Sequence, residues 1–242
     1  GYTREDVDAY AMESQKRATH ARDNGYFDKS VVPVLDKNGL TILDRDDFIK
    51  PDTSMEILAG LNPSFEMMGN MAFDDIIMSK YNKLEKISHV HTPGNSSGIV
   101  DGASAVLIGS QKAGQDLNLK ARGRIIAGAI LASDPVIMLT GPGPSAKKCL
   151  KTAGLKTTDV DLWEINEAFA SVPLRYMNDL EIDYSVTNVN GGAIAMGHPL
   201  GATGAVLVST MLDELERRDL NIGMMSLCVG GGMGISCLIE RV

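Results

Sequence analysis

Residues 188–204 read Asn188-Val189-Asn190-Gly191-Gly192-Ala193-Ile194-Ala195-Met196-Gly197-His198-Pro199-Leu200-Gly201-Ala202-Thr203-Gly204, a run of small residues around one histidine. Pro199 has a fixed φ and restricts the residue before it, so the backbone of His198 is predicted to be extended and held. The small neighbours let a substrate approach closely, and a helix predicted from Gly201 would bring N-terminal amides that favour negative charge. A structural turn histidine is the alternative, but the surrounding run favours a functional His198.

Three further motifs lie on either side of this run, each with a polar or reactive group among small residues. They are Trp163-Glu164-Ile165-Asn166-Glu167-Ala168-Phe169-Ala170, Leu227-Cys228-Val229-Gly230-Gly231-Gly232-Met233-Gly234 and Gly94-Asn95-Ser96-Ser97-Gly98-Ile99-Val100-Asp101-Gly102-Ala103. An amide, an imidazole and a thiol together suit acyl transfer, because they can move protons and hold an oxyanion. The purely structural alternatives are a helix N-cap for Asn166, a buried apolar cysteine for Cys228 and a turn serine for Ser97.

Strand and helix patterns alternate from about residue 100 onward. Five strands predicted after residue 120, with helices between them, indicate an α/β fold with a mixed five-stranded sheet and helices on both faces. The predicted strands are Arg124–Ala132, Asp161–Ile165, Val186–Val189, Ile222–Cys228 and Ile235–Ile239, and Ala103–Ile108 is a further, buried-strand candidate. The predicted helices are Gln111–Leu117, Ser145–Ala153, Glu167–Leu180 and Gly201–Arg218.

The N-terminal part of the chain has a different sequence pattern, with one predicted helix followed by a long irregular stretch. Residues 3–24 are predicted to form a helix, with Thr3 as its cap, acidic residues in its first turn and Gly25 closing it. Val31–Val34 is a short extended segment, and residues 36–88 are irregular, rich in methionine and acidic. Such a stretch indicates a long excursion over a surface.

Charge and cysteine content narrow the function classes. The net charge is −8, which argues against a nucleic-acid phosphate backbone as the main partner. No apolar run reaches membrane-spanning length, and the first residues do not read as a signal peptide. Three cysteines give no disulfide framework and indicate a reducing, cytoplasmic setting.

Two patterns that could suggest other chemistry are incomplete. His89 and His91 have no accompanying cluster of cysteines or carboxylates, so we expect no metal site and polar loop or interface roles for both. Gly141-Pro142-Gly143-Pro144 precedes a helix but lacks the Lys-Ser/Thr pair of a phosphate-binding loop. Cys149, within a helix, and Cys237, within a strand, are expected to be structural.

The four motifs, in this order, resemble those of thiolases, and the similarity runs over nearly the whole chain. The chain resembles the C-terminal part of a thiolase, whose N-terminal stretch carries the nucleophilic cysteine and another active-site histidine. Neither has a counterpart in this sequence. The resemblance implies a partial loop domain over residues 1–88, the end of the N-terminal core domain over 89–119 and the C-terminal thiolase domain over 120–242.

The resemblance also implies roles for single residues. His198 would take the proton from the nucleophilic cysteine, Cys228 would move a proton at the α-carbon, and Gly230 would supply an oxyanion-hole N–H. Asn166 would hold a water for a second oxyanion hole, and Ser97 would contact the pantetheine arm of coenzyme A. The implied reaction is thiolysis of a 3-ketoacyl-CoA or the reverse Claisen condensation, with acyl-CoA and coenzyme A as substrates, no cofactor and a homo-oligomeric enzyme.

Two other functions remain open at this point. A non-catalytic thiolase-like subunit, which binds acyl-CoA or scaffolds a partner, would account for the missing nucleophile, although it would not need the Asn166, His198 and Cys228 trio. A related condensing enzyme of the same fold is the other reading. The Cys-Gly-Gly-Gly sequence at Cys228 favours a thiolase over it, because the decarboxylating relatives typically use a second histidine.

Overall fold

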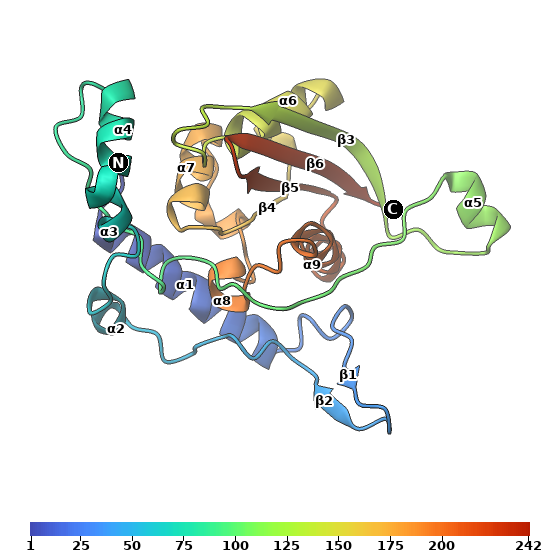
Figure 1. Ribbon diagram of the computed structural model, residues 1–242. Helices are drawn as coiled ribbons and strands as arrows, with labels where there is room; N and C mark the ends of the chain where they lie inside the picture. The colour runs from blue at the N-terminus through green and yellow to red at the C-terminus, as the bar shows by residue number, and fades with distance from the viewer.

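A mixed four-stranded sheet forms the centre of the C-terminal half of the molecule (Figure 1). The computed structural model describes residues 1–242. The strand order is β3-β6-β5-β4, in which β3 and β5 pair antiparallel with β6 while β4 runs parallel to β5. The strands are β3 (Gly123–Ala132), β4 (Leu162–Ile165), β5 (Ile222–Val229) and β6 (Met233–Arg241).

Helices cover both faces of this sheet. On one face α6 (Pro142–Ala153) and α7 (Ser171–Leu180) bury a core that includes Trp163, Tyr176 and Met224. On the other face α9 (Thr203–Arg218) packs its own apolar stripe against the sheet. All four residues of β4 are buried, as expected for a strand covered on both sides. The predicted α/β class, with helices on both faces, is confirmed.

The first helix, α1 (Arg4–Asp23), forms as predicted. The Thr3 hydroxyl accepts from the Asp6 N–H and the Asp6 carboxylate accepts from the Thr3 N–H, which completes a capping box. After the helix Gly25 adopts φ +69°, a conformation that suits glycine. One face of α1 packs against α8 (Ala193–Met196) and α2 (Met55–Ala59), so α1 lies beside the histidine-containing run.

The region between α1 and β3 is an extended excursion with short elements, in agreement with the prediction for residues 36–88. A small hairpin, β1 (Val34–Leu35) with β2 (Thr41–Leu43), extends away from the body, as Figure 1 shows. The other short elements are α3 (Glu66–Met68), the π-helix η1 (Gly69–Phe73), α4 (Asp74–Lys80) and α5 (Gln111–Asp116). Two 3₁₀ turns, η2 (Thr157–Asp159) and η3 (Tyr184–Val186), complete the list. No helix is both long and apolar enough to cross a membrane.

Three sequence-based predictions of elements are wrong in detail. Ala103–Ile108 is not a strand, because no strand of the chain lies beside it, and Leu107 is 82% exposed. The helix predicted from Glu167 begins at Ser171. The fifth strand, Val186–Val189, is reduced to one bridge between Trp163 and Thr187, so the sheet has four strands. Asn188 adopts φ +45°, which is incompatible with continuing a strand.

Candidate functional site

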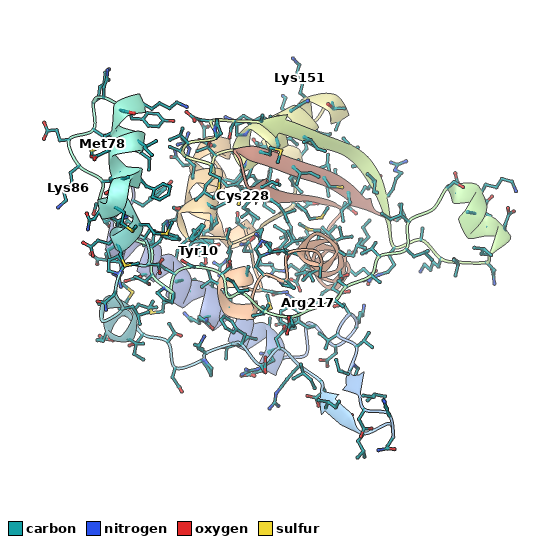
Figure 2. The ribbon with its side chains drawn as sticks, viewed as in Figure 1. Tyr10, Met78, Lys86, Lys151, Arg217 and Cys228 are labelled. Atoms are coloured by element: carbon teal, nitrogen blue, oxygen red, sulfur yellow. The ribbon has the colours of Figure 1, made fainter.

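The parallel pair β4 and β5 brings Asn166 and Cys228 to the same edge of the sheet. Asn166 directly follows β4, and its N–H donates to the Ser226 carbonyl of β5 at 3.0 Å. Cys228 lies two residues further along β5, at the same end. Parallel neighbouring strands place their carboxyl ends together, where α/β proteins commonly bind ligands. Figure 2 labels Cys228 at this end of the sheet.

The turn after Cys228 depends on its glycines. Gly231 and Gly232 adopt φ of +82° and +83°, and a Cβ on Gly232 would lie 2.8 Å from the Asp134 carbonyl. The Ser133 hydroxyl donates to the Gly232 carbonyl at 2.8 Å and ties the turn to the end of β3. Gly230 is exposed, and a Cβ there would meet nothing within 4 Å. A substrate can therefore reach the backbone of Gly230.

His198 is held from its backbone and from one ring nitrogen. Its N–H donates to the Gly98 carbonyl at 2.9 Å, and its Nδ1 lies 2.6 Å from the Thr203 hydroxyl. We assign the Nδ1–H tautomer to His198, because that hydroxyl can donate its own hydrogen to the Pro199 carbonyl at 3.0 Å and accept the proton of Nδ1. The other nitrogen, Nε2, is then unprotonated and lies 3.3 Å from Nδ2 of Asn166, which donates to it.

Burial keeps both titratable groups of the site uncharged near neutral pH. It lowers the pKa of His198, since desolvation disfavours the imidazolium. It raises the pKa of the Cys228 thiol to about 11, since desolvation disfavours the thiolate. The site thus holds a neutral imidazole whose Nε2 lone pair accepts a hydrogen bond from Asn166, and a protonated thiol, which are a base and a proton donor respectively.

Asn166 is not a helix N-cap, because α7 begins five residues later at Ser171. The residue is only 1% exposed, and its side-chain oxygen makes no hydrogen bond within the protein. Buried polar atoms are nearly always paired, so an unpaired one beside a histidine is typical of a site that acts on a ligand or a water molecule.

The Ser97 segment lies against the same site. The Ser97 N–H donates to the Ala168 carbonyl at 3.0 Å, and Ser96 forms a bridge with Phe169. Gly98 accepts the N–H of His198, as described above. The structure therefore brings together segments near residues 97, 166 and 198, while β5 contributes Cys228. An open cavity of about 340 Å³ lies between residues 100–104 and 199–202, the stretches that follow Gly98 and His198 in the chain.

The remaining candidates have separate local partners. His89 pairs with Asp74 at 2.9 Å, whereas His91 lies 3.1 Å from Asn95 and 2.9 Å from Ser171. No group of three or more His, Cys, Asp or Glu side chains is arranged to hold a metal ion. Cys149 lies on α6 and is buried in the core between this helix and the sheet, which agrees with the prediction of a structural cysteine.

Sequence reasoning missed two residues that build the site. Thr203 fixes the proton on His198, and its position within one turn of a predicted helix start was the available signal. Glu167 is fully buried beside Asn166, where it accepts four hydrogen bonds. No pattern in the sequence distinguishes this carboxylate from a solvated one, because its partners come from α1 and from residues 188–194.

Comparisons with known proteins agree with this fold. A family model described as the thiolase C-terminal domain matches residues 119–241, and the thiolase N-terminal domain matches residues 1–76. The chain is 38% identical over 245 residues to an acetyl-CoA acetyltransferase of Allochromatium vinosum, covering 100% of this chain and 57% of the relative. It is 38% identical over 247 residues to a 3-ketoacyl-CoA thiolase of Aliivibrio fischeri, covering 100% and 59%.

Solved structures give the same result. The acetyl-CoA acetyltransferase of Bacillus anthracis superposes with a TM-score of 0.86 at 34% identity, covering 100% of this chain and 57% of that one. Human mitochondrial 3-ketoacyl-CoA thiolase in complex with CoA also gives 0.86, at 38% identity, covering 100% and 55%. The chain thus spans a little over half the length of these relatives. Given the matched family models, the shared fold and the four motifs, the chain belongs to the thiolase family.

Proposed function

We propose that this chain supplies the C-terminal half of the active site of an acyl-CoA acyltransferase that cleaves 3-ketoacyl-CoA with coenzyme A or runs the reverse Claisen condensation. The observation that carries this proposal is the site geometry of His198. Thr203 accepts from its Nδ1–H, and its unprotonated Nε2 faces Nδ2 of Asn166 at 3.3 Å. A neutral histidine of this tautomer can first act as a base and then, once protonated, as a donor.

In thiolysis, Nε2 of His198 takes the proton of a nucleophilic cysteine, the residue that thiolases carry in their N-terminal stretch. The thiolate attacks the 3-keto carbon, and the backbone N–H of Gly230 stabilises the resulting oxyanion. The bond between C2 and C3 then breaks, and its electron pair moves to C2 of the departing acetyl-CoA. The protonated His198 and a water held by Asn166 stabilise the enolate oxygen, while the Cys228 thiol protonates C2.

The second half-reaction reverses these proton movements. The Cys228 thiolate takes the proton of the coenzyme A thiol, and the new thiolate attacks the acyl group on the nucleophilic cysteine. The acyl-CoA leaves, and the released cysteine thiolate recovers its proton from His198. We place the pantetheine arm of coenzyme A beside Ser97. We also propose a cytoplasmic homo-oligomer that uses acyl-CoA and coenzyme A alone.

The chemistry of the other cysteines supports a nucleophile outside residues 1–242. Burial raises the pKa of Cys149 to about 11 and also raises the pKa of Cys237. A nucleophile needs a thiolate or an adjacent base, and no histidine is among the groups that shift the pKa of either residue. A non-catalytic subunit that binds acyl-CoA is therefore the second candidate function, and it is favoured if no partner segment supplies the cysteine.

One experiment separates the two functions. The chain is joined to the N-terminal portion of a thiolase relative, covalently or in trans, and CoA-dependent loss of a 3-ketoacyl-CoA is followed. We expect turnover that His198→Asn abolishes. Acyl-CoA binding without turnover, in a complemented protein shown to be folded, would instead support the non-catalytic subunit.

A further inference from the structure

The Glu167 carboxylate is the most completely hydrogen-bonded buried charge-bearing group near the site. It is 0% exposed, and each of its oxygens accepts two hydrogen bonds. Oε1 accepts from the Tyr10 hydroxyl at 2.8 Å and from Asn188 Nδ2 at 2.9 Å. Oε2 accepts from the Ser14 hydroxyl at 2.7 Å and from the Ile194 N–H at 3.1 Å. The proposed reaction uses none of these groups.

The donors join three segments that are far apart in the sequence. Asn188 also pairs with both backbone groups of Ile165, donating to its carbonyl at 2.9 Å and accepting from its N–H at 2.8 Å. The Ser14 hydroxyl, on α1, accepts from the Gly192 N–H at 3.1 Å. A Cβ on Gly192 would lie 2.4 Å from the Glu167 carboxyl carbon, so the backbone there is wrapped closely around the carboxylate.

The segments that carry Asn166 and His198 both adjoin this cluster. Glu167 directly follows Asn166 in the chain, and Ile194 is the second residue of the short helix α8, which ends at Met196 before Gly197 and His198. The 3.3 Å contact between Asn166 and His198 therefore spans two segments that the same carboxylate holds. Figure 2 labels Tyr10 on α1, on the side of the helix that faces this region.

The absence of a counter-ion makes a stability role a poor explanation. No ion pair includes Glu167, although its side chain is fully buried. A buried carboxylate is costly, and an apolar side chain of similar volume commonly packs at least as well. A fully satisfied polar network, in contrast, specifies one arrangement of the segments that it joins.

We propose that Glu167 is a positioning residue, which fixes the Asn166 and His198 segments relative to each other and to α1 so that the oxyanion donors are set before substrate binds. This inference rests on the proposed function, since it assigns a role to Glu167 within that reaction. Catalysis is sensitive to such placement, because an error of about 1 Å in a positioned group costs on the order of 100-fold in rate.

The test compares Glu167→Gln with Leu150→Ala in the complemented enzyme. The glutamine side chain has the same volume as that of Glu167. Its NH₂ group, however, replaces a carboxylate oxygen that accepted two hydrogen bonds, so it faces two donors. We expect kcat per folded molecule to fall about 100-fold with little change in KM, because ground-state binding by Ser97 is untouched. Leu150, a buried residue of α6, belongs to the core that α6 and α7 form on one face of the sheet and gives no hydrogen bond to the Glu167 cluster, so Leu150→Ala should destabilise the fold but leave kcat per folded molecule unchanged.

A second readout does not depend on activity. In the complemented enzyme, the ¹⁵N signals of the His198 ring report its tautomer whether or not thiolysis occurs, and we expect the Nδ1–H form in the parent and in Leu150→Ala. Glu167→Gln should give a mixture of tautomers or a broadened signal. If this change occurs while the parent enzyme shows no thiolysis, the proposed function fails and the positioning role stands.

Two outcomes would overturn the positioning role. One is an unchanged kcat per folded molecule in Glu167→Gln, and the other is an unchanged His198 ring signal. If Glu167→Gln does not fold, Ser14→Ala replaces it, because that change removes one donor on α1 and leaves the carboxylate in place. We expect kcat to fall about tenfold in Ser14→Ala, a smaller loss than the one expected for Glu167→Gln, because only one of the four hydrogen bonds to the carboxylate is removed. An unchanged kcat in Ser14→Ala would again contradict the positioning role.

Discussion

At the scale of single residues, His198 and Cys228 share one physical condition, since burial disfavours the charged form of each. A histidine in this state can accept a proton, and a thiol in this state can give one. This division of roles is consistent with the proposed reaction, in which the base and the proton donor act at different steps.

The pH dependence follows from the two shifts. His198 acts only while neutral, and burial lowers its pKa from the usual value of about 6.5, so kcat/KM should decline only below that pH. Cys228 acts only while protonated, and with a pKa of about 11 it should cause no alkaline decline before about pH 11. Measuring kcat/KM across pH checks both limbs. An alkaline limb near pH 9 that moves on Cys228→Ser would contradict the assignment.

Cys228→Ala separates the half-reactions. The change removes the proton donor for C2 and the group that exchanges a proton with coenzyme A, but it leaves His198 and the nucleophile intact. Because coenzyme A can leave as a thiolate without a proton donor, the nucleophile should still be acylated by an acyl-CoA while turnover stops. Mass spectrometry of the complemented enzyme after mixing with acyl-CoA should detect the acylated protein. Turnover at the parent rate in Cys228→Ala would remove Cys228 from the mechanism.

The two oxyanion residues should differ in effect. His198→Asn removes both the base and a direct donor, whereas Asn166→Ala removes a group that acts through a water. A donor lost from an oxyanion hole costs on the order of 3 kcal/mol in the activation free energy, so His198→Asn should lose clearly more than this and Asn166→Ala about this much or less. Steady-state kcat values test the ranking, and equal, mild losses would refute it.

At the scale of elements, α1 supports the proposed active site although it carries none of the proposed reacting groups. Its Asp8 accepts from Asn95 at 2.7 Å, and its Arg17 donates to the Thr187 carbonyl at 2.8 Å. Together with Ser14 and Tyr10, these contacts tie the Ser97 segment and residues 187–194 to one rigid helix. Strain or fraying in α1 should therefore disturb the positions of the Ser97 segment and of residues 187–194.

The cap of α1 offers a direct measurement. Thr3→Ala removes the side-chain half of the capping box and should lower the free energy of unfolding by about 1 kcal/mol. Urea unfolding followed by circular dichroism gives the value, with Lys16→Ala, an exposed residue on the same helix, as the control. A Thr3→Ala midpoint no lower than that of Lys16→Ala would show that the box contributes nothing.

At the scale of the whole molecule, large apolar side chains are exposed over wide areas. Ile125 and Ile130 of β3 are 52% and 63% exposed, and Ile99 and Leu107 are 99% and 82% exposed. Exposed apolar surface of this extent is typical of an interface with another chain or domain.

We therefore expect residues 1–242 alone to associate in solution and to be inactive in cleaving 3-ketoacyl-CoA. Light scattering after size exclusion and a thiolysis assay measure both properties. Adding the N-terminal portion of a thiolase relative should give a homogeneous, active preparation. A monodisperse and active sample whose intact mass matches these 242 residues would contradict the expectation.

Short-range sequence signals determined many of the helix and strand boundaries of this protein. The Thr3 cap, the glycine run after Cys228 and the helix stops are short-range signals, so the boundaries of α1 and the two long strands near the C-terminus agree closely with the structure. The sequence pattern also predicted α9 as an amphipathic helix and the Ser145–Ala153 part of α6. The four motifs identified the family, because their order and length are specific even without a fold.

Tertiary structure decided the rest, because the deciding contacts join residues far apart in the chain. Ala103–Ile108 has the pattern of a strand but no strand beside it, and pairing needs a partner that the pattern cannot supply. Residues near 188 leave the strand conformation because the Asn188 side chain bonds to Ile165 and Glu167 instead. The tautomer of His198 and the burial of Glu167 likewise depend on Thr203 and α1, which approach only when the chain folds.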